Sequence, residues 1–191
     1  MASVLVACEL SGRVRDCLIK AGHDAVSCDL EDSESPGPHI KGDALEALHS
    51  KSWDALIAFP PCTHLSVSGA RWWPEKRKDG RQQEAEAFFL ALAQSDVPFI
   101  AIENPVGRMS TIYRKPDQIV HPWWFGDPYT KATCLWLKGF PKLEKTNPVQ
   151  PEPVSWIHRL PPSPDRGKLR SYTPQGLADA IGEQWGKFLH D

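Results

Sequence analysis

The sequence predicts a single α/β domain built on a mostly parallel central sheet that is flanked by helices. Short apolar runs of strand length alternate with helical patterns four times before residue 105. Two of these runs, 4–8 and 99–102, are apolar throughout, which is typical of parallel strands covered on both faces. The chain has 191 residues, 41% of them hydrophobic, so it can bury one substantial core.

The first unit is a strand, a turn and a helix. The strand at 4–8 ends before Glu9, and a helix with apolar residues at helical spacing runs to Ala21, where Gly22 is suited to cap it. Further strands are expected at 24–29, 40–43 and 53–59, with a short helix at 44–49.

The segment 64–81 is polar and aromatic, and we interpret it as a long loop, a kind of segment that is usually functional in a compact domain. Its basic residues, from Arg71 to Arg81, lie beside Trp72 and Trp73. Such a run is either a loop that contacts a substrate or a solvated, flexible one.

The rest of the chain returns to regular structure and then loosens. A helix with one apolar face is predicted at 82–94, and a buried strand at 99–102. Beyond Pro105, strands are expected at 118–125 and 132–137. A proline-rich connection, 137–172, leads to a last helix at 175–189, with Thr173 as its N-cap and Pro174 at its first position.

Composition disfavours several classes of protein. The formal net charge is −2, whereas dedicated nucleic-acid binders usually carry a basic excess. Five cysteines without a Cys-x-x-Cys pair and seven histidines without ligand spacing predict neither a disulfide framework nor a metal site. No apolar run approaches the roughly 20 residues that span a bilayer, and the first residues lack the basic start of a signal peptide. We therefore expect a cytoplasmic protein with no membrane partner.

The most informative stretch is 58–66, where two prolines and a cysteine follow a buried strand. Pro60 and Pro61 end the strand and stiffen the chain. Cys62 then stands at the carboxyl edge of the sheet, where open α/β folds bind their ligands. A thiol held there is a candidate nucleophile, and the alternative is a buried structural cysteine.

Acidic residues also stand where strands end, at Glu9, Asp29, Asp43 and Glu103. Each taken singly is most simply explained as a cap or turn residue. An acid after the second strand of such a sheet commonly binds a ribose, and a carboxylate near the thiol is able to hydrogen-bond or protonate a ring nitrogen. The Gly-x-Gly-x-x-Gly fingerprint and the P-loop are missing, which disfavours NAD and nucleoside triphosphates.

Taken in order, these motifs resemble the cytosine-C5 DNA methyltransferase family. The resemblance rests on Ser11-Gly12, Asp29, Asp43, Pro60-Pro61-Cys62 with Ser66 downstream, and Glu103-Asn104-Pro105. It extends over about residues 3–137, and the helix within 173–186 is suited to the place of the family's C-terminal motif.

The resemblance implies a Rossmann-like methyltransferase fold that binds S-adenosylmethionine. It assigns Glu9, Ser11 and Gly12 to the methionine end of the cofactor, Asp29 to the ribose and Asp43 to the adenine amino group. Pro60 is also expected to bind the cofactor.

The resemblance also implies covalent catalysis on a cytosine. Cys62 would attack C6, because C5 is a poor nucleophile until C6 is saturated. Glu103 would hold N3 and the amino group, and C5 would take the methyl group before losing its proton and releasing the cysteine. DNA members first flip the base out of the duplex. The residues assigned to the substrate are Ser66, Arg71, Asn104 and Pro105.

Two departures from the family pattern bear on the substrate. Where the family carries arginines that touch the base, this chain has Lys131, which supplies a charge but no guanidinium fork. The large variable region that reads the target sequence is missing, and the connection 137–172 stands in its place.

Three functions remain open. The first is a minimal DNA cytosine-C5 methyltransferase with weak sequence preference, in which the segment 71–81 closes over the flipped base. The second is the same chemistry on a free cytosine nucleotide or on RNA, favoured by the small size and acidic balance. The third is a non-catalytic module that binds nucleic acid or a partner protein, which the presence of both Cys62 and Glu103 disfavours. A second copy in a homodimer or a specificity partner would restore the missing recognition surface, and a phage is one source compatible with so small a chain.

Overall fold

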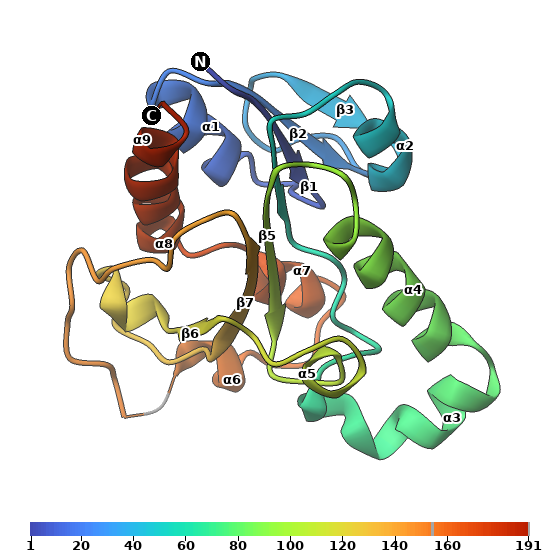
Figure 1. Cartoon of the computed structure of the whole chain (residues 1–191). Coiled ribbons are helices and arrows are strands. Elements are labelled where there is room, and N and C mark those ends of the chain that lie inside the picture. Colours follow the sequence, from blue (N-terminus) through green and yellow to red (C-terminus); the bar gives the residue numbers. More distant parts are fainter. Residues whose placement is uncertain (154, 191) are drawn as a thin grey trace.

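A seven-stranded sheet forms the centre of the protein (Figure 1). The computed structural model describes residues 1–153 and 155–190. Along the sheet the strands are β3 (His39–Lys41), β2 (Asp24–Asp29), β1 (Ser3–Ala7), β4 (Ala55–Ala58), β5 (Phe99–Pro105), β7 (Thr133–Lys138) and β6 (Gln118–Val120).

All neighbouring pairs from β3 to β5 are parallel, and β7 runs antiparallel to both β5 and β6. Val4 pairs with Ala25 on one side and Ala55 on the other, so the strand order reverses between β1 and β4. Ligands of open α/β sheets bind in the crevice at such a reversal. The predicted fold class is confirmed.

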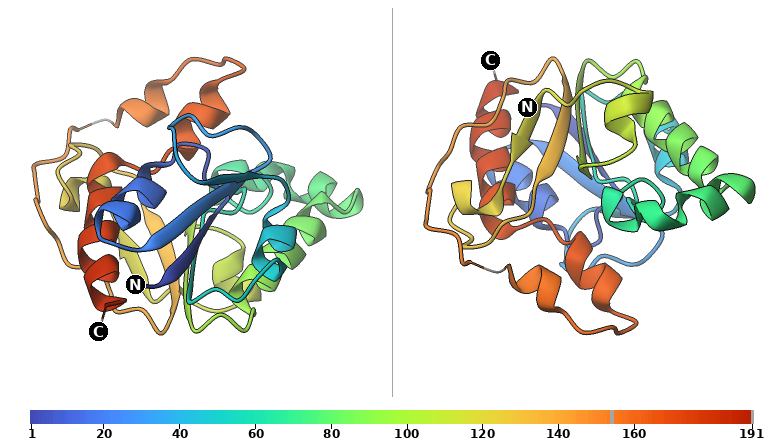
Figure 2. Two further views of the ribbon diagram at one scale, coloured as in Figure 1. Left: turned by 90° about the horizontal axis from the view of Figure 1, so that it is seen from above. Right: turned by 90° about the horizontal axis from the view of Figure 1, so that it is seen from below.

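Helices cover both faces of the sheet (Figure 2). One face carries α1 (Arg13–Lys20) and the C-terminal helical run, which consists of α8 (Gln175–Ala180), the π-helical turn η3 (Ile181–Trp185) and α9 (Gly186–Phe188). The other face carries α2 (Ala44–His49) and α4 (Arg81–Ala93). None of the described helices is both long enough and apolar enough to cross a membrane.

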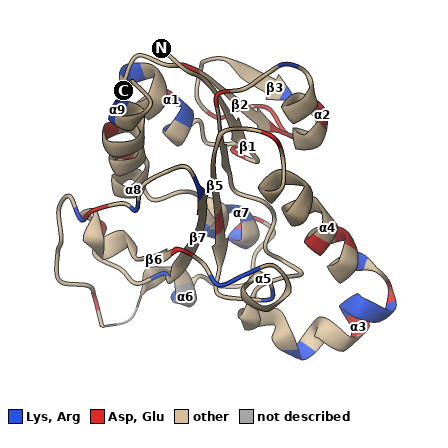
Figure 3. Ribbon diagram, in the orientation of Figure 1, with Lys and Arg blue, Asp and Glu red and all other residues tan. Residues whose placement is uncertain are grey.

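The prediction of a long loop over 64–81 is wrong, because most of this segment is helical. It forms η1 (Val67–Trp72) and α3 (Trp73–Lys78), and the basic residues of α3 stand out in Figure 3. The Ser66 hydroxyl accepts a hydrogen bond from the backbone of Ser68 and caps η1. The buried Lys76 ammonium donates to the Thr63 carbonyl at 2.6 Å, which holds α3 against the turn after β4.

The second half of the chain departs from prediction at three further places. The strand expected over 118–125 stops at Val120, and Pro122, which has no N–H for a ladder, begins the short helix η2 (Pro122–Trp124). The proline-rich connection contains α6 (Trp156–Arg159), within the part 142–165 where little regular structure is expected, and α7 (Arg166–Ser171) directly after that part. The last helix begins at Gln175, with Pro174 rather than Thr173 as its N-cap. A short helix, α5 (Met109–Ile112), follows β5.

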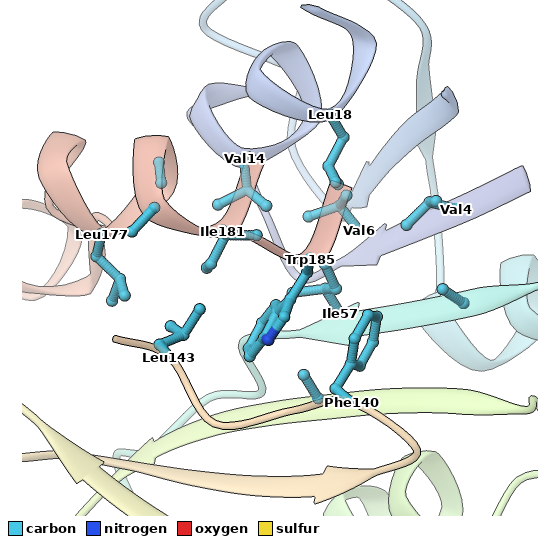
Figure 4. Packing of buried hydrophobic residues seen from close by; sticks show 14 of the residues in the cluster. Val4, Val6, Val14, Leu18, Ile57, Phe140, Leu143, Leu177, Ile181 and Trp185 are labelled. Carbon is cyan, nitrogen blue, oxygen red and sulfur yellow. The ribbon is translucent and has the colours of Figure 1, made fainter. Parts of the chain in front are cut away.

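The core lies in two layers, one on each face of the sheet. Alternate residues of β1 point to opposite faces, so Val4 and Val6 pack with the C-terminal helix while Leu5 and Ala7 pack with α2 and α4. Figure 4 shows Trp185 and its neighbours packed over β1 and β4. The Trp185 side chain is fully buried, and its indole donates to the Pro141 carbonyl at 2.9 Å.

Candidate active site

The sheet brings the turn after β4 next to the end of β5. Asn104 is buried in β5, and its side-chain amide donates to the Pro60 carbonyl at 2.8 Å. The backbone N–H groups of Leu65 and Ser66 both donate to the Cys62 carbonyl, at 3.0 and 2.9 Å. The turn that carries the thiol is therefore fixed both to its own chain and to the neighbouring strand.

A second set of backbone bonds ties the chain after Cys62 to the chain after β5. Arg108 N–H donates to the Leu65 carbonyl at 2.8 Å, and Val67 N–H donates to the Val106 carbonyl at 3.1 Å. Gly107 lies between them, where an added Cβ would collide with the Leu65 carbonyl oxygen. A glycine at position 107 is therefore needed for the chain after β5 to lie this close to the thiol turn.

Cys62, Glu103 and Lys131 gather at this edge of the sheet. They come from the turn after β4, from β5 and from the chain before β7. Glu103 lies inside β5 rather than after it as predicted, because β5 continues to Pro105 and pairs with β7. Thr133, opposite Pro105, begins β7 two residues after Lys131. The antiparallel hairpin β6–β7 thus delivers the lysine to the two residues that the parallel strands bring together.

Burial and charge set the protonation of this group. Burial raises the pKa of Cys62, the Glu103 charge raises it further, and the positive charges of Lys131 and Arg170 oppose the increase. Burial also raises the pKa of Glu103, against Lys131 and the Thr133 hydroxyl. Both groups are shifted toward their neutral forms, so Glu103 is suited to donate a hydrogen bond and Cys62 depends on the nearby cations to ionise.

The turn after β1 has unusual backbone geometry. Cys8 has a φ of 58°, in the left-handed region that side chains rarely adopt, and Gly12 has a φ of 73°. The Glu9 carboxylate is buried and accepts hydrogen bonds from the backbone N–H groups of Val14 at 2.6 Å and Arg15 at 3.2 Å. It therefore caps the N-terminal end of α1. Glu9 therefore shapes the turn. Ser11 and Gly12 form the outer part of this turn. The Ser11 hydroxyl donates to the Glu9 carboxylate at 3.4 Å and accepts from the Arg13 N–H.

Asp29 ends β2 and Asp43 follows β3, and in each carboxylate one of the two oxygens accepts hydrogen bonds. One Asp29 oxygen accepts from Glu31 N–H at 3.2 Å, and one Asp43 oxygen caps α2 through Leu45 N–H at 2.7 Å. Within the described residues the second oxygen of each makes no hydrogen bond.

Leu30 follows Asp29 with 72% of its surface exposed, and sequence reasoning missed it. Its signal was an apolar residue placed directly after a strand-ending acid. Carboxylate oxygens flanking an apolar surface suit a nucleoside, which offers hydroxyl and amino donors around a flat ring.

The remaining predicted site residues have structural contacts of their own. Ser66 caps η1, and Pro105 is the last residue of β5. Arg71 is exposed on η1, with its guanidinium 4.9 Å from the ring centroid of Trp72. The structure thus shows Arg71 on a helical projection beside the site, stacked on its own neighbour.

A buried arginine that sequence reasoning missed holds the loop between β2 and β3. Arg15 is fully buried on α1, and its guanidinium donates to the hydroxyls of Ser27 and Ser33 and to the carbonyls of Ser35 and Pro36. Its Nε donates to Asp16 at 2.8 Å, so all five of its N–H groups are used. From the sequence alone, an arginine in a short helix is expected to lie on the helix surface in contact with solvent, so its burial was not predicted.

Comparison with solved structures identifies shared architecture. No protein-family model matches the chain, and no curated protein matches its sequence. A methyltransferase from Entamoeba histolytica, EhMeth, superposes with a TM-score of 0.53 at 14% identity over 78% of this chain and 58% of that one.

Two other similar structures have lower scores. A protein assigned as a DNA modification methyltransferase encoded within an E. coli prophage has a TM-score of 0.49 at 18% identity over 86% of this chain and 56% of that one. The Dnmt2 methyltransferase of S. pombe has a TM-score of 0.47 at 14% identity over 74% of this chain and 50% of that one. The chain therefore shares its fold with a methyltransferase and spans 50–58% of the length of the structures it matches.

Proposed function

We propose that this chain is an S-adenosylmethionine-dependent cytosine-C5 methyltransferase that acts on DNA through a covalent cysteine adduct. The observation that carries the proposal is the gathering of Cys62, Glu103 and Lys131 at one sheet edge, beside the reversal of strand order at β1 and β4. A thiol, a carboxyl group shifted toward its neutral form and a cation are the groups that nucleophilic attack on a pyrimidine requires.

The neighbouring strand ends fit the cofactor. S-adenosylmethionine, when bound, supplies a methyl group on a positively charged sulfur. The left-handed Cys8 and Gly12 open the turn after β1 to close approach. Asp29 offers a free carboxylate oxygen to a ribose, Leu30 offers an apolar surface to the adenine ring, and Asp43 offers a free oxygen to the adenine amino group.

The chain's own residues account for the steps at the base. The Cys62 thiolate attacks C6, forming a sulfur–carbon bond and moving an electron pair toward C5. Glu103 donates a hydrogen bond to N3, which draws electrons from C6 and favours the attack. The C5 electron pair would take the methyl group, with the electrons of the broken bond remaining on the cofactor sulfur, which is left as a neutral thioether. C5 then gives up its proton to a general base, and the electron pair of that C–H bond expels the Cys62 thiolate, so the enzyme is regenerated.

Lys131 and Asn104 support these steps without reacting. Lys131 lowers the pKa of the Cys62 thiol against burial and thereby favours the nucleophilic form. Asn104 holds the Pro60 carbonyl and therefore sets the direction in which the thiol turn leaves the sheet. Asn104 is thus a positioning residue rather than a group that contacts the base.

The proposal is tested by calorimetry followed by adduct trapping. We expect S-adenosylmethionine to bind, and a DNA oligonucleotide containing 5-fluorocytosine to form a stable adduct, because fluorine at C5 blocks the final proton loss. Mass spectrometry should place the adduct on Cys62, and Cys62→Ser should abolish it while leaving cofactor binding unchanged. Cofactor binding without any adduct on DNA would remove DNA as the substrate.

A free cytosine nucleotide or RNA is the second candidate substrate. The observation in its favour is that, among the described residues between β7 and α8, the regular elements are the short helices α6 and α7, and neither is large enough to read a duplex groove. Transfer of radiolabel from the cofactor into mononucleotides or RNA, with none into DNA, would establish this alternative.

A further inference from the structure

A basic segment crosses the candidate active site, and its sequence position had suggested only a connection. We define the basic strap as residues 156–173, which contain α6, α7 and the chain that leads to α8. Its one acidic residue is Asp165. Its four lysine and arginine residues are Arg159, Arg166, Lys168 and Arg170. In Figure 2 the strap lies beside the loop between β2 and β3, at one end of the sheet.

The C-terminal half of α7 and the residue after it are attached on two sides to elements that flank the site. On one side Lys131 donates to the Arg170 carbonyl at 3.2 Å. On the other, Lys168 forms an ion pair with Glu34 at 2.7 Å, and the Tyr172 hydroxyl donates to the same carboxylate at 2.7 Å. Because Lys131 precedes β7 and Glu34 follows β2, α7 spans the carboxyl edge of the sheet and passes the thiol turn.

The charges of the strap are mostly uncompensated. Among the described residues, only Lys168 of its four cations forms an ion pair. The Nε atom of Arg166 is buried and has no hydrogen-bond acceptor in the described structure. A buried guanidinium N–H without an acceptor is costly, and a bound anion would supply that acceptor.

Arg170 lies next to the group formed by Cys62, Glu103 and Lys131, because its carbonyl accepts the hydrogen bond from Lys131 at 3.2 Å. Burial has the largest effect on the pKa of the Cys62 thiol and raises it, whereas the positive charge of Arg170 has the smallest of several effects and lowers it. A phosphate attached to the sugar of a cytosine is the anion that lies a few ångströms from a base under attack. Arg binds phosphate with paired N–H donors, which makes it the usual residue for this contact.

We propose that the basic strap binds the phosphate of the cytosine-bearing substrate, with Arg166 and Arg170 as its principal donors. The inference rests on the proposed function for the identity of the base. A phosphodiester of a nucleic-acid strand and the phosphate of a free nucleotide share this chemistry. The strap would thereby hold the substrate by its phosphate, whichever base-bearing molecule supplies it.

The test is a binding measurement that needs neither cofactor nor methyl transfer. A fluorescein-labelled single-stranded DNA oligonucleotide containing one cytosine is titrated with the full chain and anisotropy is followed at several salt concentrations. The variants are Arg166→Gln, Arg170→Gln and the double substitution. Lys187→Gln on α9 is the matched control, because it removes one exposed cation at the end of the C-terminal helical run that lies away from the strap (Figure 2).

We expect the double variant to bind about 20-fold more weakly at about 0.1 M salt, since each lost contact with a single strand reduces the salt slope by about 0.7. The control should keep the slope of the unmodified chain. Competition by deoxycytidine monophosphate but not by deoxycytidine would support the phosphate contact and identify a free nucleotide as one source. Preference for the oligonucleotide over the monophosphate would support the strand as the source.

Three results would overturn the proposal. The first is an oligonucleotide affinity and salt slope that the double variant leaves unchanged. The second is no binding of either probe by the unmodified chain. The third is a loss of S-adenosylmethionine affinity in the variants with oligonucleotide binding intact, which would assign the strap to the cofactor's carboxylate. Failure of the methyltransferase proposal is recognised separately, as oligonucleotide binding that depends on the strap in a chain that binds no S-adenosylmethionine.

Discussion

The contact between Asn104 and Pro60 gives the sharpest prediction, because this side-chain hydrogen bond joins the strand of Glu103 directly to the turn that precedes Cys62. Asn104 is 1% exposed, and its amide lies 2.8 Å from the Pro60 carbonyl. Asn104→Ala removes the donor and leaves a carbonyl without a partner in a site closed to water. We expect the free energy of unfolding to fall by about 1–3 kcal/mol.

The chain contains a matched control for this substitution. Asn147 is the other asparagine, it is exposed, and Asn147→Ala should change the free energy of unfolding by less than about 0.5 kcal/mol. Urea denaturation followed by tryptophan fluorescence measures both variants. Equal effects of the two substitutions would refute the reasoning.

The same variant should also loosen the thiol turn. If Cys62 is alkylated through local opening of the turn, its rate should rise by about tenfold for each 1.4 kcal/mol lost locally. Mass spectrometry of the peptide containing Cys62 after iodoacetamide treatment measures this rate, and Cys17 serves as the internal reference because it is also only half-buried. An unchanged Cys62 rate in a destabilised Asn104→Ala protein would show that the bond stabilises the fold without holding the turn.

Three further predictions follow from the described contacts. Arg15→Lys should lower the free energy of unfolding by about 1–3 kcal/mol in urea titration, because an ammonium has three donors for acceptors that now receive five. Burial lowers the pKa of His23 below its ordinary 6.5, so the unfolded chain binds the proton more readily than the folded chain. The contribution of neutral His23 to the free energy of unfolding should be full above pH 6.5 and should be lost as the pH falls below it. His23→Gln should reduce this pH dependence in urea denaturation measured across the same pH range. Glu103→Gln removes a charge that raises the pKa of Cys62, so the pH profile of Cys62 alkylation should move to lower pH, and a profile that stays in place would contradict the assigned proximity.

The parallel core could be predicted because its signals are local. The strand 24–29 was predicted with the same bounds as β2, since apolar residues bounded by a polar end mark a buried strand without reference to the rest of the chain. Parallel strands end at one edge, so Cys62 and Glu103 were expected near each other, and the structure places β4 beside β5.

The wrong predictions depended on contacts between distant residues. The helices of 67–78 are held partly by Lys76, which uses its ammonium inside the fold, whereas a lysine in a basic run reads as solvated. The order of α7 depends on Glu34, more than 130 residues earlier in the chain, through Lys168 and Tyr172. No periodicity within 156–173 contains that information, so proline content alone suggested irregular structure.

Both borders of the sheet are minimal. β3 and β6, the two edge strands, have only three residues each, so the sheet presents few unpaired backbone groups to another chain. Short edges are a common protection against strand-to-strand aggregation. A second copy or a specificity partner would consequently have little edge backbone to pair with. It would instead bind the side chains that the helices and the basic strap present.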